Sequence, residues 1–503
     1  MNVARVAIEK DMRVAEVDRR VFGAFVEHLG RCVYDGIYEP GHPSADSHGF
    51  RLDVVDLVRE LGVSTVRYPG GNFVSGYRWE DGVGPRDLRP KRLDLAWHSL
   101  ETNEIGLHEF SDWTRMVNAE LMLAVNLGTR GMQDALALLE YANHPGGTAW
   151  ADSRRSNGAE QPFGIRMWCL GNEMDGPWQL GHMSAEGYGS LAARTAAAMR
   201  MFDPRLELVV CGSSHQSMPT FGEWERVVLE HCYPHVDYLS LHAYYQERNG
   251  DLGSFLGSAV QLESFIDAVV GTVDRVRREL RQHKTIALSV DEWNVWYLDE
   301  FENGGAITDD WPRAPRLLED VYTVADAVVV GSLLIALLKH GDHVRAASLA
   351  QLVNVIAPIM TEPGGPAWRQ TTFLPFATTS RLATGEILRP RVTCGSYETA
   401  LHGDVPAVDA VATHAPDSGR TSVFLVNRDT RPCRVSIDLG DLGAERLIET
   451  LTLADADPYA QNTLQSPTRV ALSPNSSAEI TAGAVEATLP PISWTACSVG
   501  GWA

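Results

Sequence analysis

The sequence predicts an α/β protein built as a (β/α)8 TIM barrel with a C-terminal all-β sandwich of jelly-roll-like type. Between about residues 21 and 385, short apolar runs alternate with longer segments of helical periodicity, as in a parallel sheet with crossover helices. After about residue 386, short runs of alternating apolar and polar residues are broken by Gly, Pro, Asp and Asn, and no long helical pattern remains. With 503 residues and 44% hydrophobic content, the chain can bury cores of this size.

Short apolar runs in the first of these regions are the candidate barrel strands. Each run has the length of a buried strand and is bounded by polar or turn-forming residues. Their number, eight, is the number that closes a TIM barrel. In chain order they are Phe22–Val26, Ser64–Arg67, Leu121–Asn126, Ile165–Leu170, Leu206–Val210, Val236–Leu241, Thr285–Asp291 and Ala346–Ala350.

Helical segments lie between these runs and have apolar residues at three- and four-residue spacing. We expect helices over Glu186–Met201, Gln261–Arg281 and Leu317–Leu338. The last of these contains the apolar stretch Ala325–Leu338, which is shorter than the roughly 18 residues that a membrane span requires. We therefore interpret it as a buried helix of the barrel.

The first 20 residues also alternate between apolar and polar types, so we expect them to add an edge strand or two to the sandwich. The predicted domains are therefore residues 1–20, which join the sandwich, residues 21–385, which form the barrel, and residues 386–503, which form the sandwich itself. No internal repeat or low-complexity segment interrupts this division.

The composition excludes several classes of function. With 43 basic and 65 acidic residues, the formal charge of −22 repels nucleic-acid phosphates and anionic lipid, so we expect no nucleic-acid or membrane partner. Seven scattered cysteines without a CxxC spacing argue against a disulfide framework and a structural zinc site. The start lacks the apolar stretch of a secretory signal, which together with the cysteine pattern favours the cytoplasm. Because HExxH and similar spacings are absent from the sequence, we expect no metal or other cofactor.

Polar residues follow six of the predicted strands, at the end of a TIM barrel where active sites form. For one such residue alone, capping or loop hydrogen bonding is the more common role. Six strand ends of this kind on one rim point to a site, because buried polar groups cost stability unless they bind each other or a ligand. The strand-end residues are Glu27, Arg67, Asn72, Asn172, Glu173, His242, Tyr244, Glu292 and Gln351.

Two of these strand-end residues are glutamates in matching contexts, Glu173 in MWCLGNEMDG and Glu292 in IALSVDEWNVW. Cleavage of a glycosidic bond passes through an oxocarbenium-like transition state. It needs one carboxyl group to protonate the leaving oxygen and a second to stabilise or attack the anomeric carbon. The pair therefore suggests a sugar-cleaving active site.

Distinctive segments are spread over nearly the whole chain, among them FGAFVEHLGRCVYDGIYEPGHP, VRYPGGNFVSGYRWEDGVGP, RLDLAWHSLETNEIGL, WCLGNEMDGPWQ and DEWNVWY. In this order they resemble the α-L-arabinofuranosidases of glycoside hydrolase family 51. The resemblance implies an exo-acting enzyme with a retaining mechanism, a C-terminal β-sandwich and a hexamer. It also implies that the partners are arabinofuranosyl oligosaccharides derived from arabinoxylan or arabinan.

The resemblance further assigns a role to each candidate site residue. It makes Glu173 the general acid/base and Glu292 the nucleophile that forms an arabinosyl ester. Trp97 and Trp296 would shape the pocket, although the sequence favours core packing of either ring equally. The remaining roles are contact with the sugar 2-hydroxyl by Asn172, contact with other furanose hydroxyls by Glu27, Asn72 and Gln351, orientation of Glu292 by Arg67 and Tyr244, and support of the acid/base by His242.

Two alternatives stay open at the level of the sequence. The same scaffold could carry an endo-glucanase or xylosidase specificity, because a fold does not set a substrate. The chain could also be a non-catalytic carbohydrate-binding protein, although the presence of both carboxylates argues against that. The long loop Gln246–Leu256 has no assigned role, and one interpretation is that it borders the leaving-group sites.

Overall fold

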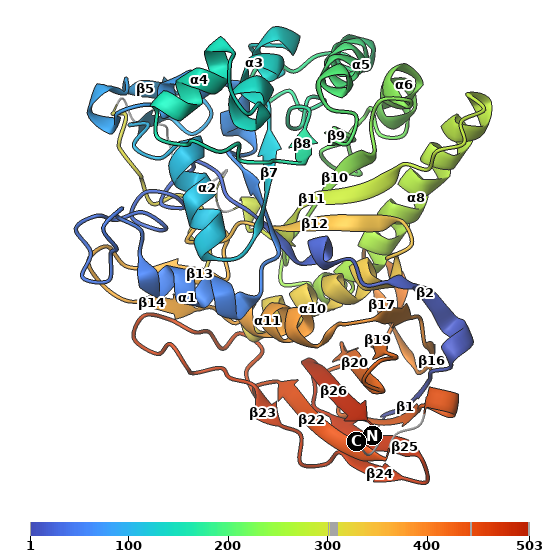
Figure 1. Cartoon of the computed structure of the whole chain (residues 1–503). Helices are drawn as coiled ribbons and strands as arrows, with labels where there is room; N and C mark the ends of the chain where they lie inside the picture. Colours follow the sequence, from blue (N-terminus) through green and yellow to red (C-terminus); the bar gives the residue numbers. More distant parts are fainter. Residues whose placement is uncertain (1, 300, 302–309, 443–444, 501–503) are drawn as a thin grey trace.

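A closed barrel of eight parallel strands forms the larger part of the molecule (Figure 1). The computed structural model describes residues 2–299, 301, 310–442 and 445–500. Each of the eight apolar runs predicted as a barrel strand contains a strand of the barrel, and the last strand pairs with the first to close it. The barrel strands are β3 (Gly23–Phe25), β4 (Thr65–Tyr68), β7 (Glu120–Ala124), β8 (Met167–Cys169), β9 (Glu207–Val210), β10 (Tyr238–Tyr245), β11 (Ala287–Val295) and β12 (Val344–Ala350).

Strands β10 and β11 extend past their predicted ends, so the sequence placed those two ends wrongly. Their pairing continues from His242 opposite Glu292 to Tyr245 opposite Val295. Polar residues in the last paired positions of a barrel strand break the apolar run without breaking the backbone pairing. Consequently His242, Tyr244 and Glu292 lie on paired strands, which fixes their positions more firmly than loops would. The register of the ladder shifts between Ser240 and His242 and between Val290 and Trp293, next to these residues.

Helices follow the barrel strands and cover the outside of the barrel. The predictions over Glu186–Met201 and Gln261–Arg281 are confirmed by α5 and α8, but the helix predicted from Leu317 begins seven residues later. Thr323 ends the preceding segment as an N-cap, because it exchanges hydrogen bonds with Asp326 (3.3 and 2.7 Å). Among the described residues, the α-helices are α1 (Leu52–Leu61), α2 (Leu107–Met116), α3 (Met132–Asn143), α4 (Ala149–Ser156), α5 (Ala185–Phe202), α6 (Glu223–Cys232), α7 (Leu252–Leu256), α8 (Ser258–Glu279), α10 (Val324–Lys339) and α11 (Phe373–Leu382).

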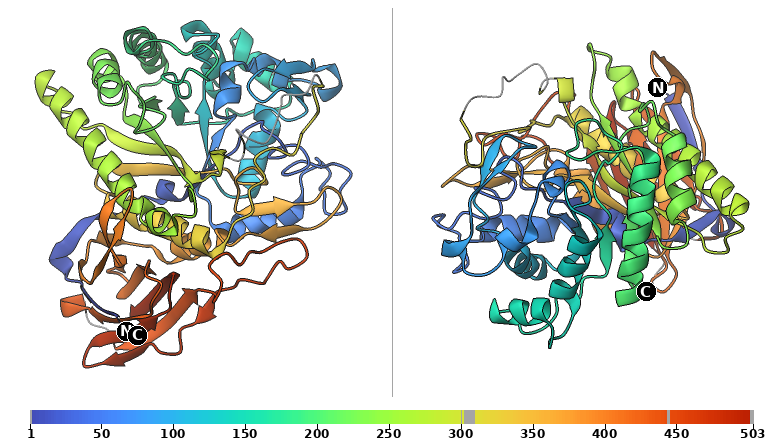
Figure 2. Two further views of the ribbon diagram at one scale, coloured as in Figure 1. Left: turned by 180° about the vertical axis from the view of Figure 1, so that it is seen from behind. Right: turned by 90° about the horizontal axis from the view of Figure 1, so that it is seen from above.

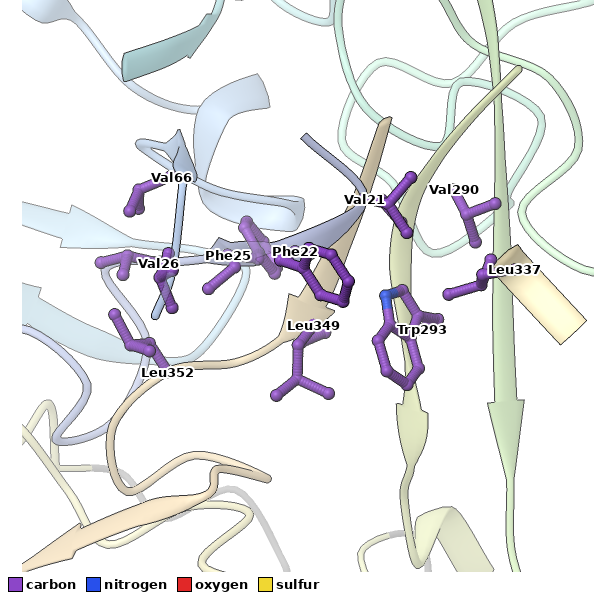
Figure 3. Close-up of a cluster of buried hydrophobic side chains, with 14 of the residues drawn as sticks. Val21, Phe22, Phe25, Val26, Val66, Val290, Trp293, Leu337, Leu349 and Leu352 are labelled. Atoms are coloured by element: carbon purple, nitrogen blue, oxygen red, sulfur yellow. The ribbon is translucent and has the colours of Figure 1, made fainter. Parts of the chain in front are cut away.

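Helix α10 is apolar on all sides because it is buried on all sides. It lies between the barrel and the sandwich, where it packs against β11 and β12 on one side and β19, β20 and β26 on the other (Figures 1 and 2). The prediction of a buried helix is therefore confirmed. None of the described helices is both long and apolar enough to cross a membrane. Figure 3 shows part of the core next to α10, with Phe22, Val290, Trp293, Leu337 and Leu349.

The C-terminal part consists of two packed sheets around a separate apolar core. From the N-terminal segment, β1 lies inside the five-stranded sheet and β2 lies at the edge of the seven-stranded sheet. The predicted edge position is therefore confirmed for β2 and wrong for β1, because β16 pairs with the outer side of β1. In spatial order, the five-stranded sheet contains β16 (Arg391–Thr393), β1 (Asn2–Ala7), β21 (Cys433–Asp438), β25 (Ala484–Leu489) and β24 (Glu479–Thr481). The seven-stranded sheet contains β2 (Arg13–Glu16), β15 (Glu386–Leu388), β19 (Val408–Ala415), β20 (Arg420–Asn427), β26 (Ser493–Gly500), β22 (Arg446–Leu453) and β23 (Ser473–Pro474).

Three two-stranded hairpins complete the described strands. One carries Trp97 in its turn and the other two extend from the barrel and from the sandwich. They are β5 (Arg92–Asp94) with β6 (Ser99–Glu101), β13 (Ile359–Thr361) with β14 (Ala367–Arg369), and β17 (Ser396–Thr399) with β18 (Gly403–Pro406).

The contact between α10 and the sandwich depends on Gly331. A Cβ atom at this position would lie 2.2 Å from Cδ1 of Trp494 in β26. We therefore expect Gly331→Ala to lower the free energy of unfolding by about 1–3 kcal/mol, the usual cost of overpacking a core. Differential scanning calorimetry measures the effect as a lower Tm. Gly271→Ala in α8 is the matched control, because no atom lies within 4 Å of its added Cβ. Equal Tm values for the two variants would contradict the close packing.

Candidate active site

The carboxyl ends of the barrel strands bring the predicted site residues together. Six of the eight barrel strands contribute a side chain in their last residues or after their end, and hydrogen bonds or ring contacts connect most of these side chains to one another. Their places are Glu27 after β3, Arg67 in β4, Asn72 in the 3-10 turn Asn72–Ser75, Trp97 after β5, Asn172 and Glu173 after β8, His242 and Tyr244 in β10, Glu292 in β11, Trp296 after β11, and Gln351 after β12.

Glu292 is buried, and both of its carboxylate oxygens accept hydrogen bonds. Arg67 Nη1 donates to Oε1 at 2.8 Å, and the Tyr244 hydroxyl donates to Oε2 at 2.7 Å. Arg67 also donates to Asn172 Oδ1 at 2.5 Å, so one guanidinium fixes two side chains of the site. These contacts hold the carboxylate in one orientation.

Glu173 lies in a strained turn and faces Glu292. Its backbone φ is +43°, a left-handed conformation that costs a non-glycine residue about 1–3 kcal/mol and is concentrated at functional sites. Its carboxylate accepts hydrogen bonds from His242 Nδ1 at 2.8 Å and from Trp178 Nε1 at 2.6 Å. The turn therefore aims the carboxyl group of Glu173 into the site, where two donors hold it.

His242 connects the two glutamates. Its Nδ1 lies 2.8 Å from Glu173 Oε1 and 3.6 Å from Glu292 Oε2. Burial opposes the charged imidazolium, but the Glu292 carboxylate and the hydrogen bond to Glu173 raise the pKa of His242 above its ordinary value. The imidazole ring is thus placed to share a proton with the acid pair.

Glu27 is a further buried carboxyl group of the site. It accepts hydrogen bonds from the Phe73 amide at 2.9 Å, from Trp97 Nε1 at 2.8 Å and from Gln351 Nε2 at 3.3 Å. The backbone at Gly70, just before Asn72, lies very close to the Glu27 side chain. A Cβ atom at Gly70, where φ is +143°, would lie 2.4 Å from Glu27 Cγ. Only glycine fits there.

Burial raises the pKa of Glu27 to about 8, and the nearby Glu292 and Asp94 carboxylates add to this effect. The folded protein therefore favours the protonated form of Glu27. The contribution of this group to stability is complete below about pH 4.5 and is lost as the pH rises through about 8.

We expect Glu27→Gln to flatten the decrease of the unfolding free energy between about pH 4.5 and pH 8, because the amide does not titrate. Urea denaturation at a series of pH values measures this decrease for the wild type and the variant. Glu398→Gln, at an exposed position of β17, is the control and should keep the wild-type slope. The interpretation is wrong if Glu27→Gln keeps that slope as well.

The two tryptophans of the prediction lie at the site, where their rings also pack against the barrel core. Both are partly exposed. Trp97 donates to Glu27, and the Trp296 ring packs edge-on against Tyr244 with ring centroids 5.0 Å apart. Trp296 Nε1 is buried and has no hydrogen-bond partner among the described residues, so this ring presents a polar atom as well as an apolar face.

Three residues of the site were not predicted from the sequence. The Trp178 indole is half-exposed and donates to Glu173. Gln179 accepts from Asn172 Nδ2 at 3.4 Å, and the buried Asp291 lies 3.7 Å from Arg67 Nε. A signal for Trp178 exists, because a tryptophan directly after the turn-forming Gly176-Pro177 pair is badly placed for a core.

The chemistry of the site follows from the spacing of its titratable groups. One carboxylate oxygen of Glu173, one of Glu292 and a ring nitrogen of His242 all lie within 4.8 Å of one another. Among the described residues, these three side chains have the types and spacing that could hold a cation. Two carboxyl groups so close together can also act on one glycosidic bond, where one protonates the leaving oxygen and the other attacks the anomeric carbon.

Comparisons with known proteins agree with this chemistry. The family description "Alpha-L-arabinofuranosidase 1 domain" matches residues 57–261, and "Alpha-L-arabinofuranosidase C-terminal domain" matches residues 291–493. The first range contains Glu173 and the second contains Glu292.

Curated relatives are similar over almost the whole chain. An exo-α-(1→6)-L-arabinofuranosidase of Bifidobacterium longum is 57% identical over 99% of this chain and 97% of its own length. An intracellular exo-α-(1→5)-L-arabinofuranosidase of Streptomyces lividans is 56% identical over 98% of this chain and 75% of its own length. Among solved structures, a family 51 α-L-arabinofuranosidase from Bifidobacterium longum has a TM-score of 0.96 at 51% identity, covering 99% of this chain and 100% of its own.

Proposed function

The chain belongs to the α-L-arabinofuranosidases of glycoside hydrolase family 51, and from this membership we propose that it releases terminal L-arabinofuranose from the non-reducing ends of arabino-oligosaccharides. The reaction proceeds by double displacement through a covalent arabinosyl-enzyme, with retention of configuration. The substrates are oligosaccharides derived from arabinan or arabinoxylan.

One observation carries the retaining mechanism, namely the short distance between the two carboxyl groups. Oxygens of Glu173 and Glu292 lie within 4.8 Å of each other. Retaining glycosidases have carboxyl groups about 5–5.5 Å apart, whereas inverting enzymes need about 6.5–9.5 Å to admit a water molecule. The spacing supports direct attack by Glu292 on the anomeric carbon.

In the first step, Glu173 gives its proton to the leaving oxygen while Glu292 attacks the anomeric carbon, so the glycosidic bond breaks and an ester forms. Arg67 and Tyr244 hold the attacking carboxylate by its two oxygens. In the second step, Glu173 removes a proton from water, which attacks the same carbon and releases Glu292. His242, placed between both carboxylates, supports these changes of protonation.

The sugar is held by the polar side chains that surround this pair. We assign contact with the 2-hydroxyl to Asn172, and contact with the other furanose hydroxyls to Glu27, Asn72 and Gln351. The assignment of Glu27 is supported by its raised pKa, because a protonated carboxyl group both donates and accepts hydrogen bonds at neutral pH. Trp97 and Trp296 close the pocket with apolar faces.

The proposal is tested by initial rates on 4-nitrophenyl α-L-arabinofuranoside, 4-nitrophenyl β-D-xyloside and carboxymethylcellulose. We expect the arabinofuranoside to be preferred by far. Proton NMR of the first released sugar should then show the α-anomer, as retention requires. Preference for either of the other substrates would transfer the function to a xylosidase or an endo-glucanase, and a β-anomer would refute the retaining mechanism.

The relatives do not agree on the linkage, because similar identities connect this chain to an enzyme named for α-(1→6) bonds and to one named for α-(1→5) bonds. Product profiles on defined oligosaccharides with 1→2, 1→3, 1→5 and 1→6 linkages resolve the preference.

We further propose a cytoplasmic hexamer, since several relatives are named intracellular and the family resemblance implies six subunits. Light scattering coupled to gel filtration measures the subunit number.

A further inference from the structure

A large groove lies beside the catalytic pocket, where the barrel rim meets the sandwich. Its volume is about 880 Å³, within the range of roughly 300–1,000 Å³ that is usual for small-molecule sites. Three partly exposed side chains give it apolar faces, namely Phe301 (40% exposed), Val321 (45%) and Tyr459 (48%). None of these residues has a role in the double displacement, so the groove needs its own explanation.

The walls of the groove are tied together by hydrogen bonds. The loop after β10 is joined to the segment after β11 by Gln246, whose side chain donates to Asp299 Oδ1 at 3.0 Å and accepts from the Asp299 amide at 3.3 Å. The same loop is joined to the sandwich, because the Tyr459 hydroxyl donates to Glu247 at 3.0 Å. The Tyr459 ring is therefore held in place without help from a ligand.

The sandwich reaches the groove through the long loop between β22 and β23, which leaves the sheet and runs along the barrel (Figure 1). The carbonyls of Pro458 and Ala460 accept hydrogen bonds from the first amides of α10, at 2.9 and 3.0 Å. Tyr459 lies between these two anchors. Its position depends on the same contacts that join the sandwich to the barrel.

The lining selects the chemistry of the occupant. Four carboxylates and one guanidinium face the groove, in a chain with a net charge of −22, so an anionic ligand would be repelled. Carboxylates accept hydrogen bonds from hydroxyl groups, and side-chain amides both accept hydrogen bonds from hydroxyl groups and donate to them. Aromatic rings pack against apolar surface. Neutral sugars combine these two kinds of surface. The charged residues are Glu247, Arg248, Asp299, Glu319 and Asp320.

The groove lies close to the catalytic pocket. Two lining residues of the groove follow site residues closely in the sequence. Gln246 comes two residues after Tyr244, and Tyr297 comes five residues after Glu292. Even a fully extended chain of five residues spans only roughly 18 Å, so the walls of the groove begin near the nucleophile. The Phe301 ring in the groove also contacts the Trp97 ring in the pocket, with centroids 6.5 Å apart. An exo-acting enzyme leaves the rest of its substrate outside the pocket, and this groove is next to it.

We propose that this groove binds the leaving-group part of the substrate, a neutral pentose chain beyond the first unit, with Tyr459 of the sandwich as its aromatic platform. The proposal rests on the proposed arabinofuranosidase function and adds a subsite to it. It also gives a role to residues 246–250 and makes the sandwich part of substrate recognition. The end of the segment predicted as one long loop, Leu252–Leu256, instead forms α7 and does not line the groove. The occupying chain can come from arabinan or from xylan, and the two sources share this chemistry.

The test compares kcat/KM on three substrates for the wild type and Tyr459→Ala. The substrates are 4-nitrophenyl α-L-arabinofuranoside, a linear arabinotetraose, and a xylotetraose with one arabinofuranosyl branch. We expect Tyr459→Ala to lower kcat/KM by about tenfold on at least one of the two oligosaccharides, the usual effect of losing an anchoring aromatic side chain, and by less than twofold on the aryl substrate. The substrate that is affected identifies the source of the chain.

Two further variants keep the test decisive. Val321→Arg narrows the groove from an exposed position and should reproduce the selective loss if Tyr459→Ala does not fold. Phe202→Ala, at the end of α5, is the matched control, because its ring is 37% exposed and does not line the groove. Equal effects on all three substrates, or none, would overturn the proposal. If the wild type does not cleave the aryl arabinofuranoside, the proposed function itself fails, which is a separate outcome.

Discussion

Replacing Glu292 by Ala is expected to lower kcat on every arabinofuranoside by on the order of 10⁵-fold or more, because no other carboxylate can form the ester. The variant should remain folded. Arg67, which loses its partner at 2.8 Å, keeps Asp291 at 3.7 Å as a counter-charge, so the buried guanidinium is not left alone. Stopped assays with 4-nitrophenyl α-L-arabinofuranoside measure the loss, and thermal unfolding checks the fold.

Azide distinguishes the loss of a nucleophile from general damage to the site. In Glu292→Ala, the side-chain volume that is removed lies beside the anomeric carbon on the face of attack. Azide entering there forms a bond to this carbon while the glycosidic bond breaks and Glu173 protonates the leaving oxygen. The product should therefore be the β-configured arabinofuranosyl azide, with inversion. An α-configured azide, or activity near that of the wild type, would show that Glu292 is not the nucleophile.

The fold could be predicted well because its signals are local. Each barrel strand is an apolar run of its own, and α10 is apolar all round because it is covered all round. The start of α10 and the ends of β10 and β11 were wrong for a different reason. They depend on a side-chain cap at Thr323 and on pairing between His242 and Glu292, and neither interaction leaves a mark in hydrophobicity.

The site was predictable only in part. Polar residues at strand ends pointed to the rim of the barrel, and the family resemblance supplied roles that spacing alone does not give. The groove at Tyr459 could not be predicted, because its walls come from segments more than 150 residues apart in the sequence, such as Asp299 and Tyr459. The positive φ of Glu173 is likewise a property of the turn that the folded barrel imposes.

Replacing Glu173 by Ala should separate the acid from the nucleophile through the leaving group. Protonation matters most when the departing alkoxide is basic, so cleavage of arabino-oligosaccharides should fall by about 10²–10⁴-fold, the usual contribution of a general acid. Aryl arabinofuranosides with acidic phenols leave without help and should still form the ester. Their slow step then becomes attack by water, which Glu173 no longer assists. A burst of phenol in rapid-mixing experiments would reveal the accumulated arabinosyl-enzyme.

Azide should rescue Glu173→Ala with the opposite stereochemistry to that of Glu292→Ala. It attacks the ester from the side that the missing carboxyl group faced and gives the α-configured product, because two inversions restore the original configuration. The pH profile of kcat/KM, bell-shaped in the wild type, should lose its upper limb in the variant, since that limb reports the general acid. If both classes of substrate lose activity equally and the upper limb stays, the proton comes from another group. His242 would then be the residue to test, because its titratable ring lies in direct contact with Glu173, at 2.8 Å.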